Sequence, residues 1–203
     1  MIVMKSVAAE AALQPYFQII NRVVDGAWQD WRNNPLAPQM QHKRVRATCV
    51  WNQLIARSRR EFADDPTVRV TTIKEWEGLL FNDRIFVRFK KAPRDLISRN
   101  YPTKQALAYN DLKQDLFDGV SRLELVYVLD PSETLIDRIC IVQRDRNQIV
   151  WRVDVKGSAG DEAQNVLPFA PIAPSGTPVA ERVLKSKRKQ EQNDAKEQLG
   201  GDS

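Results

Sequence analysis

The amino-acid sequence predicts an α+β fold in which an N-terminal helical hairpin packs with an antiparallel sheet of about five strands, followed by a disordered C-terminal tail. Over residues 14–63 the apolar residues recur every three to four positions, which is typical of amphipathic helices. After residue 66, apolar and polar residues alternate instead, which is typical of half-buried strands. The strands do not alternate regularly with helices, so a doubly wound parallel sheet is not expected.

The first predicted element is an amphipathic helix over residues 14–32. An asparagine pair and Pro35 then end it, because proline disfavours helical geometry in the preceding residue. A second helix is expected over about residues 38–63, so the two predict an antiparallel hairpin, with residues 1–13 as an N-terminal extension. The apolar face of the first helix carries Phe17, Ile20, Val24, Trp28 and Trp31.

Five later segments have the patterns of strands. Within one of them, Ile85, Val87 and Phe89 point one way and the charged residues between them point the other way. The pair Asn82 and Asp83 suits a tight turn just before that strand. The five segments are residues 68–71, 84–90, 123–129, 135–143 and 148–155.

A third helix is expected over residues 103–117, with Thr103 as its N-cap. All these elements belong to a single α+β domain of residues 14–157. Residues 158–203 are rich in proline and alanine and then in charge, so they are expected to form a linker and a disordered charged tail.

Composition narrows the function classes. Cys49 and Cys140 lie in apolar stretches, which indicates neither a disulfide nor a zinc site. His42 is the only histidine, so a zinc site with two histidines is excluded, and its neighbours indicate an exposed helix start. With no signal peptide and no apolar run of about 18 residues, we expect a cytoplasmic protein without a membrane partner. The basic neighbours of His42 that indicate this helix start are Lys43, Arg44 and Arg46.

The densest chemical feature is a basic run between residues 84 and 105. Its cations could neutralise phosphates or hold an acidic group of a protein partner. The run could equally be a solvated strand face followed by an ordinary polar loop, because half-exposed antiparallel strands often carry charge on one side. The candidate binding residues are Arg84, Arg88, Lys90, Lys91, Arg99, Asn100, Lys104 and Gln105.

A second candidate site lies at the end of the last strand. Asp154 and Lys156 are two residues apart and are expected on the same face, as in metal-dependent nucleases with an Asp-x-Lys motif. Such a site also needs an upstream acid on a neighbouring strand, for which Glu124, Asp130 or Asp137 is a candidate. Mg²⁺ would be the cofactor in this case alone, and no cofactor is expected otherwise. The pattern also fits an ordinary strand end.

The chain also resembles a family of uncharacterised prokaryotic mobile-element proteins over about residues 40–155. Members of that family are encoded beside a helix-turn-helix protein fused to an ImmA/IrrE-like metallopeptidase. The resemblance implies a component of a toxin-antitoxin or phage-defence module that acts through a protein partner, with the toxic member as one option. The residues also leave open a metal-dependent nuclease and a non-catalytic nucleic-acid-binding accessory protein. The resemblance lies in residues 87–91, 98–100 and 102–106, and in Arg144, Arg146 and Trp151.

Overall fold

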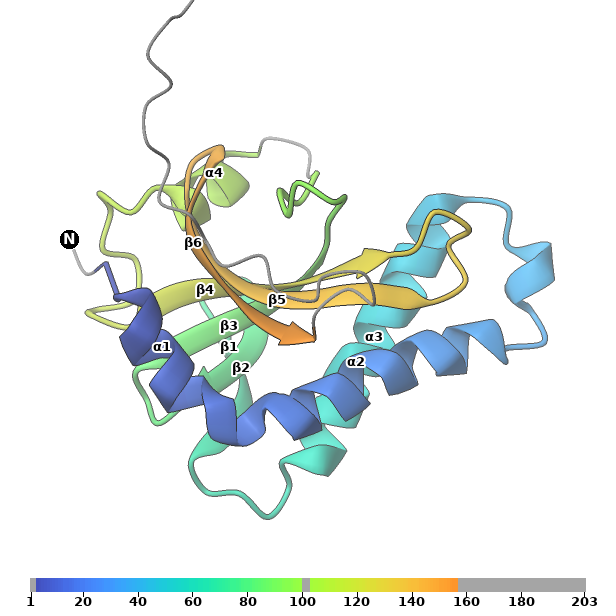
Figure 1. The fold of residues 1–203 in the computed structure, drawn as a ribbon, viewed down its shortest axis with the longest axis horizontal. Coiled ribbons are helices and arrows are strands. Elements are labelled where there is room, and N and C mark those ends of the chain that lie inside the picture. Colours follow the sequence, from blue (N-terminus) through green and yellow to red (C-terminus); the bar gives the residue numbers. More distant parts are fainter. Residues whose placement is uncertain (1–2, 100–102, 157–203) are drawn as a thin grey trace, which may run out of the picture. The chain divides into compact units, whose positions relative to one another are not determined.

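The fold is α+β, as the sequence predicts, with helices packed on a six-stranded sheet (Figure 1). The structure is a computed structural model and describes residues 3–99 and 103–156. The predicted tail over 158–203 therefore lies outside the described residues. The helices are α1 (Ser6–Leu13), α2 (Phe17–Arg32), α3 (Lys43–Glu61) and α4 (Lys104–Asn110), with 3₁₀ turns at Gln14–Tyr16 and Ala37–Gln39. The strands are β1 (Val68–Ile73), β2 (Trp76–Phe81), β3 (Ile85–Lys91), β4 (Ser121–Leu129), β5 (Ile136–Asp145) and β6 (Gln148–Lys156).

Helices α2 and α3 form the predicted antiparallel hairpin. The guanidinium of Arg57 donates two hydrogen bonds to Asp30, at 2.7 and 2.6 Å, across the helix pair. Gly26 makes room for this crossing, because a Cβ there would lie 2.3 Å from the guanidinium. The N-terminal extension forms α1, which the sequence did not predict, and its Leu13 is fully buried in the core.

The main core lies between the helices and one face of the sheet. Val87 and Phe89 of β3 point into it, as their alternation predicts, and Leu123 and Leu125 of β4 continue the same face. The buried face of α2, with Trp28 only 2% exposed, packs on β5 and β6, and α3 packs on β1 and β3. This packing places the N-terminal half of α3 beside the ends of β3 and β4.

The strands follow chain order in the sheet, and every neighbouring pair is antiparallel except β3 and β4. Those two are parallel, because the chain crosses over through α4 between them. The expectation of a wholly antiparallel sheet is therefore wrong at this pair. The predicted number of about five strands becomes six because β2 was missed. This strand does not alternate, since its last four residues are buried.

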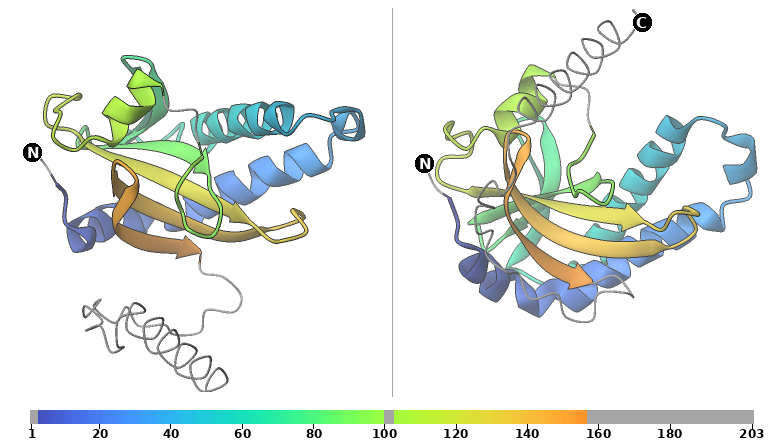
Figure 2. Two further views of the ribbon diagram at one scale, coloured as in Figure 1. Left: turned by 90° about the horizontal axis from the view of Figure 1, so that it is seen from above. Right: turned by 45° about the horizontal axis from the view of Figure 1, so that its top comes forward.

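The crossover segment covers the second face of the sheet. In Figures 1 and 2, α4 lies on one side of strands β3 to β5, and α1 and α2 lie on the other. The hydroxyl of Thr103 accepts a hydrogen bond from the amide of Ala106 at 3.1 Å, which confirms the predicted cap. The helix ends at Asn110 rather than at residue 117. There the Asp111 carboxylate accepts from the amide of Lys113 and starts a turn.

In the part of the chain that the structure describes, none of the helices is long and apolar enough to cross a membrane.

Candidate functional site

A large pocket opens between the N-terminal half of α3, the carboxyl ends of β3 and β4, and the β4–β5 turn. It has a volume of about 1090 Å³. Because β3 and β4 are parallel, their carboxyl ends meet at the same edge of the sheet and together form one wall. We call it the basic pocket, since seven basic residues line it against two acidic ones: Lys43, Arg44, Arg46, Lys90, Lys91, Arg94 and Arg99 against Asp130 and Glu133.

The first turn of α3 supplies three of the pocket's cations, at Lys43, Arg44 and Arg46. The helix begins after His42, whose side chain makes no capping hydrogen bond, and its first turn carries no acidic residue. Positive charge at a helix N-terminus opposes the macrodipole and costs about 0.3–1 kcal/mol per charge at an exposed site. Arg46 is offset by Glu133, whereas Lys43 and Arg44 break this local rule, as residues at functional sites often do.

The two acidic residues of the pocket are already engaged. Glu133 accepts hydrogen bonds from Arg46 at 2.7 Å and from Lys91 at 2.9 Å. The bond from Lys91 has the larger effect, and together the two lower the pKa of Glu133 to about 2. Asp130 accepts from the backbone amides of the β4–β5 turn, including Leu135 at 2.6 Å. Neither carboxylate is therefore available to balance the other cations.

Several of the pocket's cations have no partner among the described residues. Arg99 is exposed and pairs with Asp95 at 2.5 Å. Within the part of the chain that the structure describes, no hydrogen bond or ion pair engages the side chain of Lys43, Arg44, Lys90 or Arg94. These cations can therefore receive an anionic ligand without breaking an existing contact.

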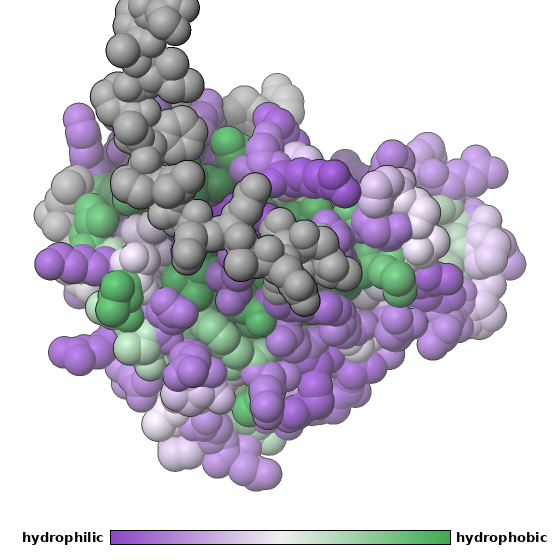
Figure 3. Space-filling model, in the orientation of Figure 1, coloured by the Kyte–Doolittle hydropathy of each residue, from purple (hydrophilic) through white to green (hydrophobic). Residues whose placement is uncertain are grey.

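An aromatic side chain accompanies the cations. Trp51 lines the pocket from α3 and is half-buried, whereas Trp28, Phe89 and Tyr127 are almost fully covered. Figure 3 shows mainly hydrophilic residues along α2. A half-buried indole beside unpaired cations offers a face on which a planar ligand could stack.

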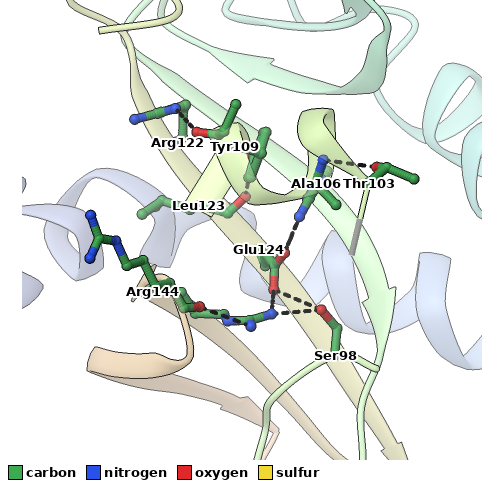
Figure 4. Close-up of polar contacts among 11 residues, drawn as sticks. Ser98, Thr103, Ala106, Tyr109, Arg122, Leu123, Glu124 and Arg144 are labelled. Atoms are coloured by element: carbon green, nitrogen blue, oxygen red, sulfur yellow. Dashed lines mark hydrogen bonds and ion pairs between the residues drawn. The ribbon is translucent and has the colours of Figure 1, made fainter. Parts of the chain in front are cut away.

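A buried ion cluster lies near Lys90, which lines the inner wall of the pocket, and Figure 4 shows part of the cluster. Glu124 on β4 accepts from Arg88 of β3 through one oxygen and from Arg144 of β5 at 3.2 Å through the other. Ser98 accepts from Arg144 at 2.8 Å and donates to Glu124 at 3.3 Å. The guanidinium of Arg88 also lies 3.6 Å from the ring centre of Tyr109. Both carboxylate oxygens of Glu124 are thus occupied.

This cluster corrects the prediction for Arg88. The sequence made Arg88 a candidate binding residue on an accessible strand face, with a solvated face as the alternative, but the residue is only 5% exposed. The strand alternation was correct, and the crossover segment covers that face. Burial raises the pKa of Glu124, but the charges of Arg88 and Arg144 outweigh it and lower the pKa below its usual value.

Lys90 connects the ion cluster with the pocket. It follows Arg88 on the same face of β3, is half-buried and lines the pocket. Burial, and then the charge of Arg88, lowers the pKa of Lys90 from 10.5 to about 8. Among the described residues, Lys90 is therefore an unpaired cation in a region of positive potential.

The remaining residues of the basic run do not join the pocket. Arg84 is exposed just before β3, at the opposite end of the strand from Lys90. Lys104 and Gln105 are exposed in the first turn of α4 and do not line the pocket. Asn100 lies outside the described residues. The tertiary structure thus brings together Lys90, Lys91 and Arg99 and separates the rest.

Asp154 and Lys156 do not share a face, so this premise of the nuclease hypothesis is wrong. A shift of register between β5 and β6 pairs Asp154 with Cys140 and Lys156 with Ile139. The Cys140 thiol donates to Asp154 at 3.0 Å, on the face away from α2. Lys156 instead pairs with Asp25 of α2 at 3.1 Å.

The third nuclease candidate, Asp137, lies on β5 and is half-exposed. Within residues 3–99 and 103–156, no three His, Cys, Asp or Glu side chains come together in a group that could hold a metal ion.

Sequence reasoning missed two parts of this site. Lys43, Arg44 and Arg46 stand out as three basic residues within four positions, but they were interpreted only as an exposed helix start. The buried ion pair of Glu124 with Arg144 left no local signal, because the two residues lie twenty positions apart and meet only through strand pairing.

No family model, no curated protein and no solved structure matches this chain.

Proposed function

We propose that this protein binds single-stranded nucleic acid in the basic pocket, as the nucleic-acid-binding member of a cytoplasmic toxin-antitoxin or phage-defence module. The observation that carries the proposal is the excess of basic over acidic residues around the pocket, seven against two. Four of these cations, Lys43, Arg44, Lys90 and Arg94, have no partner within the part of the chain described.

The shape of the site favours an unpaired strand over a duplex. A pocket of about 1090 Å³ is at the upper limit of the volumes that hold small ligands, about 300–1,000 Å³, and can admit an unstacked nucleotide. Trp51 offers a face for base stacking, which contributes about 1–3 kcal/mol per base in single-strand binders. The surrounding lysines and arginines suit the phosphates on either side.

The cellular setting comes from the resemblance to mobile-element proteins. In that setting the neighbouring gene encodes a protein partner, and the pocket would confer nucleic-acid recognition on the pair. Induction of this chain alone, compared with induction beside its neighbour, tests the setting in a bacterial host. Growth arrest that the neighbour relieves supports a toxic member, and unimpaired growth in both cases supports an accessory role.

Binding is tested directly by fluorescence anisotropy with a labelled single-stranded oligonucleotide over a series of salt concentrations. A Lys43→Gln/Arg44→Gln variant should bind about tenfold more weakly and should lower the salt slope by about 1.4, because each phosphate contact to a single strand contributes about 0.7. The matched control is Arg84→Gln/Lys104→Gln, which removes the same charge outside the pocket.

The two variants separate a pocket from a diffuse charge effect. Equal weakening in both would show that net charge alone attracts the strand and would contradict the proposal. Absence of binding to any single strand at low salt would also contradict it.

A further inference from the structure

Lys90 differs from the other unpaired cations of the pocket in its surroundings. Lys43, Arg44 and Arg94 are exposed, whereas Lys90 is half-buried on β3 beside the ion cluster. A desolvated ammonium without a counter-ion is costly, since burial penalises its charged form. The fold nevertheless places this one in the wall of a pocket.

No carboxylate of the ion cluster is free to neutralise Lys90. Glu124 uses one oxygen for Arg88 and shares the other between Arg144 and Ser98. Arg88 and Arg144 bind the single carboxylate, and Lys90 feels the charges of all three, so about two positive charges, Lys90 included, are left unbalanced. The Nε of Arg144 is also buried and has no hydrogen-bond partner within the described part of the chain.

We propose that Lys90 binds the terminal phosphate of a nucleic-acid strand or nucleotide, in a phosphate subsite at the inner wall of the basic pocket. This inference rests on the proposed function and names the chemical group that the pocket recognises. Lys90 contacts the phosphate directly, and the buried guanidiniums of Arg88 and Arg144 supply a positive potential behind it.

The charge balance favours a terminal phosphate over an internal one. A phosphate monoester carries about 1.5 to 2 negative charges near neutral pH, whereas a phosphodiester carries one. The excess of about two positive charges, Lys90 included, therefore matches a monoester.

The test compares two single-stranded oligonucleotides of the same sequence, one ending in a phosphate and one in a hydroxyl. The wild-type protein should prefer the phosphorylated strand by about tenfold, about 1.4 kcal/mol. Lys90→Gln should remove that preference, and Lys90→Arg should retain most of it. Lys104→Gln, a loss of the same charge outside the pocket, should leave it intact.

A second measurement needs no variant. Acetylation of Lys90 in the wild-type protein, followed by mass spectrometry, should slow more in the presence of the phosphorylated strand than of the hydroxyl strand. A nucleoside monophosphate that protects Lys90 and competes with the strand would identify a free nucleotide as the source of the phosphate. Protection by the strand alone would identify a nucleic-acid end.

The outcomes distinguish the inference from the proposed function. Equal binding of both strands, or a preference that survives Lys90→Gln in full, would overturn the phosphate subsite and leave nucleic-acid binding in place. Failure of both strands and of the nucleoside monophosphate to bind at low salt would overturn both proposals.

Discussion

At the scale of single residues, Glu124 shows how a charge on a strand can become part of the interior. Its carboxylate balances Arg88 and Arg144 under the crossover segment, with side-chain exposures of 2%, 6% and 4%. Removal of one member of a buried ion cluster leaves the others desolvated and unpaired, which costs more than the intact cluster contributes. The stability of the fold therefore depends on Arg88, Glu124 and Arg144 together, and not on each residue separately.

Glu124→Gln should lower the free energy of unfolding by about 3–5 kcal/mol, because it leaves two buried guanidiniums without a counter-charge. Chemical denaturation monitored by tryptophan fluorescence measures this loss. The triple variant Arg88→Met/Glu124→Leu/Arg144→Met removes all the charges together and should be markedly less destabilised. A triple variant less stable than Glu124→Gln would contradict this account.

Lys90 makes stability depend on pH with a predictable sign. Its pKa in the folded protein is about 8, below the ordinary 10.5, so the unfolded chain binds more protons between these values. The penalty is fully present below about pH 8 and disappears as pH rises towards 10.5. Lys90→Met should therefore be more stable than wild type at neutral pH.

Denaturation of both proteins across the alkaline range measures that difference. The stability advantage of Lys90→Met should shrink as pH rises through 8 towards 10.5. An advantage that stays constant, or a variant less stable than wild type at neutral pH, would show that Lys90 is already balanced by another group.

At the scale of elements, the β2–β3 hairpin illustrates how local chemistry and close packing combine. Asn82 and Asp83 both adopt positive φ angles, 48° and 55°, at the centre of a β-turn of the mirror-image type, which the Arg84 amide closes by donating to the carbonyl of Phe81 at 3.0 Å. On β2, Gly78 lies against the backbone of β3, and a Cβ there would be 2.4 Å from the carbonyl oxygen of Val87. Backbone cannot move aside as a flexible side chain can.

Gly78→Ala should therefore lower the free energy of unfolding by about 1–3 kcal/mol, the usual cost of overpacking. Gly26→Ala on α2 is the matched control. Its new methyl group meets only the flexible end of Arg57, and alanine is favoured over glycine in a helix by about 1 kcal/mol. Thermal unfolding of both variants checks this, and equal midpoints would contradict the backbone argument.

At the scale of the whole molecule, the hydrophobic core is contained in the first part of the chain. The chain divides into two units, residues 1–162 and 163–203, and the main core runs from Ala9 to Ile141 within the first. It includes the helix layer, both central strands and the covered face of β5. The pocket lining, from Trp28 to Glu133, belongs to the same unit.

Removal of residues 163–203 should therefore leave the unfolding midpoint of the first unit unchanged within a few degrees, because no residue of the described core is lost. Calorimetry of the shortened and full-length chains measures this. A large fall in the midpoint would show that residues 163–203 contribute contacts to the folded unit.

Much of the fold could be predicted from the sequence because the signals are local. The spacing of Trp28 and Trp31 predicted a buried helix face, and the alternation in β3 predicted its inward residues. The Thr103 cap also depends on residues a few positions apart. By contrast, β2 was missed because strand residues buried on both faces lose the alternation that marks a half-buried strand.

The sequence by itself determined the α+β class, the helical hairpin and the presence of a dense basic run. Only the tertiary structure decided which of those charges face a common pocket. Arg88 is buried by a crossover that begins beyond its own strand, and a register shift turns Asp154 away from Lys156. The cations of α3 and Lys90 line one pocket because of helix–sheet packing. These outcomes depend on contacts between residues far apart in the chain, which a local pattern does not record.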